Sequence, residues 1–393
     1  MRIAAALRIL GATGSVLLVA AHGVACLPNG SACDRPAAAC PATGSATETG
    51  SDSGTATTGG SATTQAGSTQ DGSGDSVDSS TTEVLDCHGA SLRVATFNVK
   101  SVGFEGSDEW NALGSVLARL QPDVVCIEEL ADGETAPLRA LTMSLGWSEP
   151  IQADPSPAIG GELRNACMSP HAISRIDSYS GEDLSSDQHA NDVGRDFLGV
   201  RIVIDDCAMG LLAVHAKSGQ EDLDRFRRQV EFERLRQAID DMHARHPGEP
   251  LVVMGDFNEN TDDPSLGQVF DAPPVGLPRS YRLGSDIALP MTYDPFTTVS
   301  NAGLTAIDAT HEDSSRIGTW GVSAGSDGVR IDYIWLDGPQ LVNAIVYDAC
   351  RDDGVDEPPA GQWLALAGDP VPCVASALAS DHLPVVADIT LLP

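Results

Sequence analysis

The chain has 393 residues, of which 42% are hydrophobic and 20% are charged, so it can form one large domain or two ordinary ones with a sizeable core. Its 23 Lys and Arg residues stand against 56 Asp and Glu residues, which gives a formal net charge of −33. A surface this acidic repels polyanions and anionic membranes at long range, so a phosphate-bearing substrate needs cations to bridge it.

The first 25 residues have the pattern of a secretory signal peptide. Arg2 and Arg8 supply the basic start, an apolar run covers residues 9–21, and small residues precede Cys26. The run is too short for a membrane span, so we expect an exported protein, extracellular or on the cell surface. Two forms of processing stay open. Cys26 resembles the acylated cysteine of bacterial lipoproteins, which would attach the chain to a membrane, whereas Gly23 stands where that pattern usually has Leu.

Residues 26–83 are expected to form a disordered tether rich in Gly, Ser and Thr. From about residue 41 to residue 82 the chain contains no aromatic residue. Such a segment cannot bury enough apolar surface to fold. The folded domain is therefore predicted over residues 84–393.

Nine cysteines in an exported chain suggest disulfides before metal ligands, because no Cys-x-x-Cys pair occurs. Local pairing is plausible for Cys33 with Cys40 and for Cys350 with Cys373. Cys126 lies inside an apolar stretch, where a buried free thiol is an alternative to a disulfide.

The folded domain begins with a pattern of strand, helix and strand. The apolar and β-branched residues 92–99 predict a core strand, and residues 123–127 predict a second one. Between them, Ser107 can cap a helix that Pro122 ends. Polar residues stand at the ends of both strands, namely Asn98 in the first and Glu128 and Glu129 after the second.

Further strands are predicted over residues 171–175, 198–204 and 209–214, and the last of these runs into His215. A long polar helix is expected from about residue 220 to residue 244. Its apolar stripe consists of Phe232, Leu235, Ile239 and Met242, and later strands are predicted over residues 331–336, 341–347 and 384–389.

Residues 251–254 suit a short strand that is buried on both faces, and Gly255 lets the backbone turn after it. Asp256 and Asn258 stand two residues apart, so on an extended strand end both side chains leave by the same face. They can then reach one hard cation or one phosphate oxygen. For an isolated pair, an Asx-turn is the simpler interpretation.

Five further motifs support the functional interpretation of this pair. They are TFN at residues 96–98, EE at 128–129, HAKSG at 215–219, RIDY at 330–333 and SDH at 380–382, with GDFN at 255–258 between the third and the fourth. In this order they resemble the endonuclease/exonuclease/phosphatase superfamily over roughly residues 91–392. The resemblance implies an α/β (α+β) fold, a four-layer αββα sandwich of two packed mixed β-sheets flanked by helices.

The resemblance also implies a metal site that holds Mg²⁺, or alternatively Mn²⁺ or Ca²⁺. Asn98 and Glu129 would be the ligands, with Asp381 nearby, and such oxygen ligands fit a hard ion. Glu128 stands where the family often has Gln, so Glu129 is preferred over it. Lys100 departs from the abasic-site endonucleases, which carry an acidic residue there.

The catalytic roles implied by the resemblance fall on five residues. His382 would be the general base that activates water, and Asp332 would hold its imidazole in the right tautomer. Asp256 would orient the nucleophile, while Asn258 and His215 would contact the phosphate and stabilise the charge that develops on it. The acidic partner of His215 is not identified, Glu162 being a weak candidate.

The sequence therefore favours a secreted or surface-anchored, divalent-metal-dependent phosphoesterase. We expect a monomeric phosphodiesterase that cleaves DNA or RNA. One alternative is a hydrolase of phospholipid, sphingomyelin or small phosphate esters, and another is a non-catalytic surface binding module on the same fold. Arginines that a nuclease could use are Arg164, Arg175, Arg195, Arg201, Arg225, Arg227 and Arg228.

Overall fold

The computed structural model describes residues 89–156, 163–311, 317–323, 326–338, 340–352, 354 and 364–391. The predicted signal peptide, the tether at residues 26–83 and Glu162 lie outside these described residues, as do Cys33 and Cys40. Across the described part of the chain, none of the helices combines the length and the apolar character that a membrane crossing requires.

Two mixed β-sheets form the centre of the domain. Within the described residues, one sheet has seven strands and the other has six. In spatial order the first sheet consists of β12 (Thr310–His311), β16 (Gln340–Val346), β17 (Val385–Leu391), β1 (Ser91–Asn98), β2 (Val124–Ala131), β4 (Leu163–Met168) and β3 (Ile151–Gln152). The second sheet consists of β11 (Leu304–Ala306), β15 (Asp332–Asp337), β8 (Leu251–Asp256), β7 (Cys207–His215), β6 (Phe197–Ile204) and β5 (Ile173–Tyr179).

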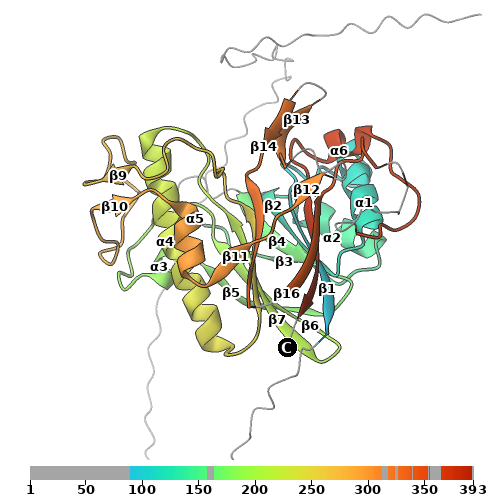
Figure 1. Cartoon of the computed structure of the whole chain (residues 1–393), viewed down its shortest axis with the longest axis horizontal. Helices are drawn as coiled ribbons and strands as arrows, with labels where there is room; N and C mark the ends of the chain where they lie inside the picture. Colours follow the sequence, from blue (N-terminus) through green and yellow to red (C-terminus); the bar gives the residue numbers. More distant parts are fainter. Residues whose placement is uncertain are drawn as a thin grey trace, which may run out of the picture. The chain divides into compact units, whose positions relative to one another are not determined.

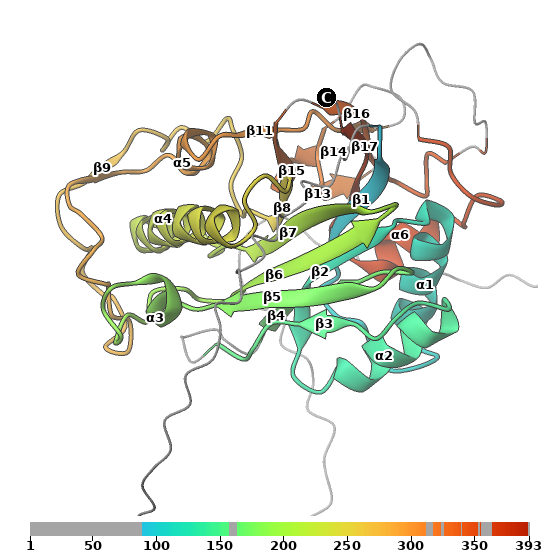
Figure 2. The ribbon, with the colours of Figure 1, turned by 90° about the horizontal axis from the view of Figure 1, so that it is seen from below.

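Helices cover the outer faces of both sheets, on opposite sides of the pair (Figures 1 and 2). On the first sheet, apolar residues of the helices pack against the outward side chains of β1 and β2. On the second sheet, they pack against β7 and β8. The helices on the first sheet are α1 (Asp108–Leu120), α2 (Thr135–Ser144) and α6 (Val374–Ala379), and those on the second are α3 (Gly181–Leu184), α4 (Asp222–Arg245) and α5 (Pro295–Asn301).

The core between the two sheets comes from the strand residues that face inward. Val94 and Cys126 of the first sheet, for example, belong to one buried cluster with Leu211 and Met254 of the second. Because strand side chains alternate between faces, each central strand packs on the facing sheet with one face and on helices with the other. The predicted four-layer αββα sandwich is therefore confirmed.

Two predicted helices are also confirmed. Ser107 caps α1 by accepting a hydrogen bond from the backbone N of Trp110 at 3.2 Å, and the helix ends before Pro122. The apolar stripe of α4 is buried, as Phe232 and Ile239 illustrate. The same helix also buries arginines, which its amphipathic pattern did not predict.

Several elements differ from the prediction. β2 continues to Ala131 through a β-bulge after Ile127, so Glu128 and Glu129 lie inside the strand. Strand β4, the short helices α2, α3, α5 and α6, and two small hairpins were not predicted. The hairpins are β9 (Val269–Phe270) with β10 (Met291–Thr292), and β13 (Trp320–Ser323) with β14 (Ser326–Val329).

Two disulfides join pairs of cysteines that both lie within the described residues. Cys350 and Cys373 are bonded, as predicted. Cys126 of β2 is bonded to Cys167, which stands directly opposite it on β4. The alternative of a free thiol at Cys126 is therefore wrong, because the strand that carries its partner was not recognised in the sequence.

Candidate active site

The predicted catalytic residues meet at one edge of the sandwich because of strand direction. β1 and β2 run parallel, and so do β7 and β8, so their carboxyl ends lie together. β15 runs antiparallel to β8 and therefore begins where β8 ends. The register places His215, Asp256 and Asp332 side by side on adjacent strands of the second sheet.

Asn98 links the two sheets at this edge. It is buried at the end of β1, and its Nδ2 donates to Asp256 Oδ2 at 2.9 Å and to Glu129 Oε1 at 3.2 Å. Its Oδ1 accepts from the backbone N of Lys100 at 3.1 Å. One amide group therefore lies between two carboxylates, one from each sheet.

Glu129 and Glu128 occupy different environments because of the bulge in β2. Glu129 has a φ of 64°, which turns its side chain toward Asn98. Glu128 is fully buried and accepts a hydrogen bond from Thr96 Oγ1 at 2.8 Å. Burial raises the pKa of Glu128 well above its usual value, as do the negative charges of Asp332 and Asp256. The position of Glu129 in the site agrees with its preference over Glu128.

His382 and Asp332 form a buried pair. His382 lies between α6 and β17, and its Nδ1 is 3.0 Å from Asp332 Oδ2, while its Nε2 is 4.0 Å from Asp256 Oδ2. Ser380 holds the loop, since its Oγ accepts from the backbone N of His382 at 3.0 Å and donates to the carbonyl of Asn98 at 2.6 Å. Burial lowers the pKa of His382, but the Asp332 carboxylate outweighs burial and raises this pKa to about 9.

His215 is almost completely buried at the end of β7. Its Nε2 lies 3.7 Å from both Glu129 Oε1 and Asp256 Oδ2, and its Nδ1 has no hydrogen-bond partner among the described residues. Burial lowers the pKa of His215 well below its usual value, with a further contribution from the positive charge of Arg195. The imidazole is therefore neutral at neutral pH.

Asn258 and Asp381 lie at the periphery of this group of residues. The Nδ2 of Asn258 donates to Asp256 Oδ2 at 3.1 Å and to the carbonyl of Ala216 at 3.0 Å, so in this arrangement it positions Asp256. The side chain of Asp381 is 48% exposed, and its Oδ2 lies 3.2 Å from Lys100 Nζ. Asp381 thus lies at the mouth of the site, beside Lys100.

The model of the Endonuclease/Exonuclease/phosphatase family matches residues 95–382, which is more than half of the chain. The chain belongs to this family. It is therefore a hydrolase of phosphate ester bonds. A comparison with curated proteins gave no match.

Solved structures with a similar fold are 13–15% identical to the chain. Truncated TDP2 from Caenorhabditis elegans is 15% identical, with 78% of this chain and 100% of that chain covered and a TM-score of 0.45. The human Nocturnin catalytic domain with bound sulfate is 14% identical, with coverages of 77% and 95% and a TM-score of 0.48. D. rerio TDP2 complexed with a single-strand DNA product is 13% identical, with coverages of 77% and 100% and a TM-score of 0.45. At such identities and TM-scores these structures carry no argument about function.

Arg195 belongs to the site of this family member, although the sequence did not single it out from six other arginines. It precedes β6, and its Nη1 donates to the carbonyl of Ala216 at 3.2 Å. Its Nε has no hydrogen-bond partner among the described residues. Burial lowers the pKa of Arg195 against the attraction of nearby carboxylates, which include Asp256 and Glu129. An arginine remains charged under such conditions, so Arg195 brings a cation to the site.

The other arginines are engaged elsewhere, which only the structure shows. Most of them have a carboxylate partner, and Arg227 lies over an aromatic ring. The pairs are Arg164 with Asp132, Arg175 with Asp154, Arg201 with Glu249, Arg225 with Asp222, Arg228 with Glu259 and Arg227 with Tyr281.

The donor set fits a divalent cation, on which members of this family generally depend. Asp256, Asp332 and His382 offer ligand atoms within 4.8 Å of one another. Burial raises the pKa of Asp256, and the negative charge of Asp332 raises it further. This excess of buried negative charge is what a bound cation neutralises. Glu129 and Asp256, on either side of the Asn98 amide, would hold the ion.

Proposed function

We propose that the chain is a divalent-metal-dependent phosphodiesterase that cleaves nucleic acid. The observation that carries this proposal is the buried pair of Asp332 and His382, which faces Asp256 across 4.0 Å beside the Asn98 and Glu129 pair. A base, an orienting carboxylate and an oxygen-rich group from both sheets are the parts that hydrolysis of a phosphodiester requires.

The roles of the residues follow from their surroundings. Asp332 fixes the Nδ1 proton of His382, so Nε2 is the atom that can accept a proton from water. The nearby carboxylates outweigh burial and raise the pKa of His382 to about 9, so Nε2 would act as a base once a bound cation offsets their charge and lowers this pKa. Asp256 lies beside Nε2 and can orient that water. A divalent cation, when bound, supplies positive charge that polarises the phosphate and offsets the carboxylates.

Charge on the phosphate is then stabilised by two groups of the chain. His215 is neutral and can donate only a hydrogen bond, whereas Arg195 adds a full positive charge. His215 is the last residue of β7, and Arg195 donates to the carbonyl of the next residue, Ala216, so both groups have fixed positions for this task.

The test uses the purified chain with DNA, RNA, a sphingomyelin vesicle and 4-nitrophenyl esters in Mg²⁺, with and without EDTA. We expect hydrolysis of nucleic acid that EDTA abolishes and that Mg²⁺ or Mn²⁺ restores. His382→Ala should lower turnover by about 10²–10⁴-fold. The matched control is His171→Ala, since His171 is a half-exposed histidine paired with Asp123. Undiminished turnover after chelation, or in His382→Ala, would contradict the proposal.

One observation favours phospholipid hydrolysis as a second candidate. The hairpin of β13 and β14 carries exposed apolar side chains, with Trp320 45% and Val329 39% exposed. The backbone of Trp320 pairs with that of His382, so this hairpin lies next to the base. Hydrolysis of the vesicle lipid with intact DNA and RNA would favour this candidate over the nuclease.

We further propose that the enzyme is exported and monomeric. The signal-like residues 1–25 support export, and the two disulfides are consistent with an oxidising compartment. Mass spectrometry of the mature amino terminus distinguishes a lipidated Cys26 from ordinary cleavage, and sedimentation analysis tests the monomer.

A further inference from the structure

A recess of about 690 Å³ adjoins the catalytic histidine and is not explained by the catalytic residues. This volume is in the range of ligand-binding pockets, about 300–1,000 Å³. Asp381, His382 and Leu383 line the recess. The other walls come from Gly321 and Val322 of β13, from α6, and from the segment that carries the Cys350 and Cys373 disulfide.

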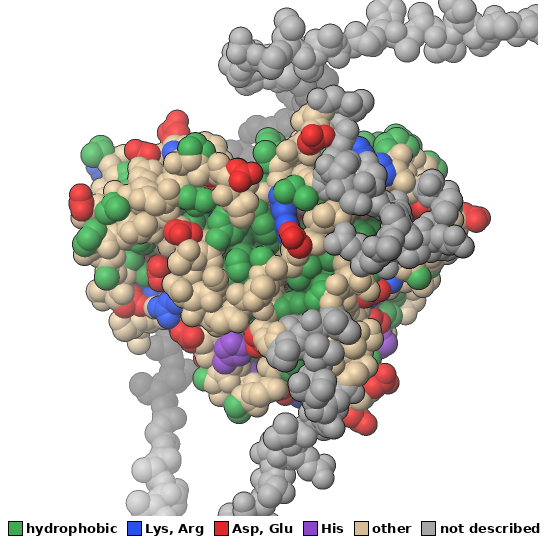
Figure 3. Space-filling view, viewed as in Figure 1, with side chains coloured by type: hydrophobic (Ala, Val, Ile, Leu, Met, Phe, Trp, Pro, Cys, Tyr) green, Lys and Arg blue, Asp and Glu red, His purple; other side chains and the backbone are tan. Residues whose placement is uncertain are grey.

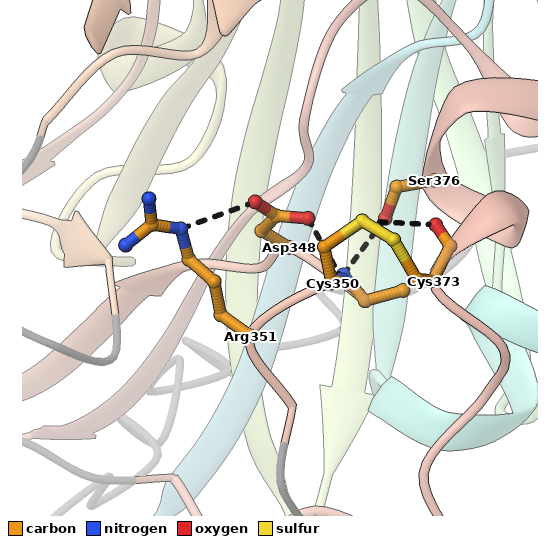
Figure 4. The surroundings of a disulfide bond; sticks show 6 residues. Asp348, Cys350, Arg351, Cys373 and Ser376 are labelled. Atoms are coloured by element: carbon orange, nitrogen blue, oxygen red, sulfur yellow. Dashed lines mark hydrogen bonds and ion pairs between the residues drawn. A yellow bond between two sulfur atoms is a disulfide. The ribbon is translucent and has the colours of Figure 1, made fainter. Parts of the chain in front are cut away.

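The apolar walls of the recess are Val322, Leu383, Ala377 and the disulfide between Cys350 and Cys373. Figure 4 shows this disulfide beside Asp348, Arg351 and Ser376. Both cysteines are exposed at the surface of the protein. The disulfide therefore presents sulfur and methylene groups to a ligand.

The polar groups of the recess are used within the protein. The Ser376 Oγ accepts from the backbone N of Ala349 at 2.9 Å, and the Asp348 Oδ1 accepts from the backbone N of Cys350 at 2.9 Å. Asp348 Oδ2 is also 3.3 Å from the Nε of Arg351. A ligand therefore meets mostly apolar surface in the recess.

The charges of the recess are also compensated. Asp348 faces Arg351, and Asp381 faces Lys100. A second phosphate group placed in the recess would have to compete with a carboxylate for either cation. An uncharged substituent of the scissile phosphate can bind without displacing a carboxylate from its cation.

We propose that this recess is a substrate subsite that binds an uncharged, mainly apolar ring joined through oxygen to the scissile phosphorus. The inference rests on the proposed phosphodiesterase function. A nucleobase with its sugar and a simple aryl group share this chemistry. Binding of the ring against Val322, Ala377 and the disulfide would place the phosphate near His382, because His382 lines the same recess.

The test compares three diesters that share a methanethiolate leaving group, which carries no ring, and that have a methyl, a phenyl or a thymidine 5′ substituent. The variant is Ala377→Trp, in which an exposed helix residue that lines the recess is replaced by a side chain that fills it. The matched control is Leu378→Trp, since Leu378 is the next residue of α6, is also exposed and does not line the recess.

We expect Ala377→Trp to lower kcat/KM at least tenfold for the phenyl and thymidine esters and less than twofold for the methyl ester. Leu378→Trp should change all three less than twofold. Val322→Asn, which places a polar side chain at another lining residue, should reduce the preference for the ring esters about threefold. An equal loss for all three esters in Ala377→Trp, or no loss, overturns the subsite. A loss for phenyl alone, or for thymidine alone, identifies which ring the subsite takes.

A binding measurement separates the subsite from the proposed function. Isothermal titration in Mg²⁺ compares phenylphosphonate with methylphosphonate, neither of which is turned over. We expect tighter binding of phenylphosphonate by at least tenfold, and loss of this preference in Ala377→Trp. If no diester is hydrolysed but this preference is present, the phosphodiesterase function fails and the subsite stands. Equal binding of the two phosphonates overturns the subsite.

Discussion

Two neighbouring residues before β6, Arg195 and Asp196, point into different surroundings. Arg195 donates to the carbonyl of Ala216 in the loop after β7, whereas Asp196 is buried and accepts a hydrogen bond from Ser178 Oγ at 3.3 Å. The alternation of side chains along an extended backbone produces this separation. Each residue leads to a prediction.

Arg195→Met should lower kcat/KM for a diester by about 10²-fold, since loss of one group that stabilises transition-state charge typically costs 10²–10³-fold. The control is Arg201→Met, because Arg201 is paired with Glu249 at 2.7 Å and should not affect turnover. Steady-state kinetics of both purified variants measure the difference. Equal activity of the two variants would remove Arg195 from the mechanism.

Asp196 should make the free energy of unfolding depend on pH. Burial raises the pKa of Asp196 to about 6, above its value in the unfolded chain. The folded state therefore holds this proton more tightly, so the contribution is present below about pH 4 and is lost as the pH rises through about 6. Asp196→Asn removes this pH-dependent loss of stability, which amounts to about 1–3 kcal/mol in the free energy of unfolding between pH 4 and pH 7.

Urea denaturation of the wild-type protein and Asp196→Asn at pH 4 and at pH 7 measures this change. The stability of the variant relative to the wild type should be greater at pH 7 than at pH 4. A difference that is the same at both pH values would show that Asp196 titrates normally.

The sequence predicted those site residues that stand at the ends of recognisable strands. Asn98 and Asp256 follow apolar runs whose direction brings them to one edge. Arg195 could not be distinguished from the six other arginines in the sequence. Most of the partners of those arginines come from distant parts of the chain, so only the structure shows that they are engaged elsewhere. The different environments of Glu128 and Glu129 depend on a β-bulge in β2. The pattern of apolar residues in this strand does not predict a bulge.

At the scale of elements, α4 holds the catalytic loops in place through Arg228. Its Nη1 donates to the carbonyls of Lys217 and Gly219 in the loop after β7, at 2.6 and 2.9 Å. Its Nη2 donates at 2.8 Å to Glu259, which directly follows Asn258 in the loop after β8. Tyr293 donates a further hydrogen bond to Glu259. One buried guanidinium thus joins both loops to the helix.

Arg228→Met should destabilise the protein by about 3–5 kcal/mol, because it leaves Glu259 buried without its partner. Arg236→Met is the control on the same helix, since Arg236 pairs with Asp240 on the surface and should cost less than about 1 kcal/mol. Urea denaturation measures both. Similar midpoints for the two variants would show that the buried pair contributes no more than an exposed one.

The elements that the sequence left out are those with few residues or with unusual composition. Helix α6 is six residues long, which is shorter than the stretch over which a helical pattern can be recognised, and β13 has only four residues, one of them Gly321. The recess beside His382 is built from these two elements and a disulfide. The residues of the proposed catalytic centre could therefore be named from the sequence, whereas those of the recess next to it could not.

At the scale of the whole molecule, the charge of −33 acts against any polyanionic substrate. Figure 3 shows Asp and Glu side chains spread over the visible face, with fewer Lys and Arg side chains between them. A protein that binds DNA through many phosphate contacts loses affinity steeply as salt rises. Repulsion between like charges has the opposite dependence, because salt screens it.

Cleavage of a single-stranded oligonucleotide should therefore stay constant or increase when NaCl is raised from about 50 to 500 mM at fixed Mg²⁺. The methyl 4-nitrophenyl diester serves as the control for salt effects on the chemical step. The ratio of the two kcat/KM values measures the effect. A steep fall of this ratio with salt would indicate a basic binding surface that the net charge conceals.

The catalytic centre straddles two sheets that touch only through side chains. Asn98 and Glu129 belong to one sheet, and Asp256 belongs to the other. The distances between His382, Asp256 and Glu129 therefore depend on how tightly the core between the two sheets is packed. A shift of about 1 Å at a reacting centre can cost about 10²-fold in rate. Turnover therefore depends on residues that face the core between the sheets, such as Met254 and Leu211. A substitution that loosens the packing of this core should abolish activity before the strands unfold.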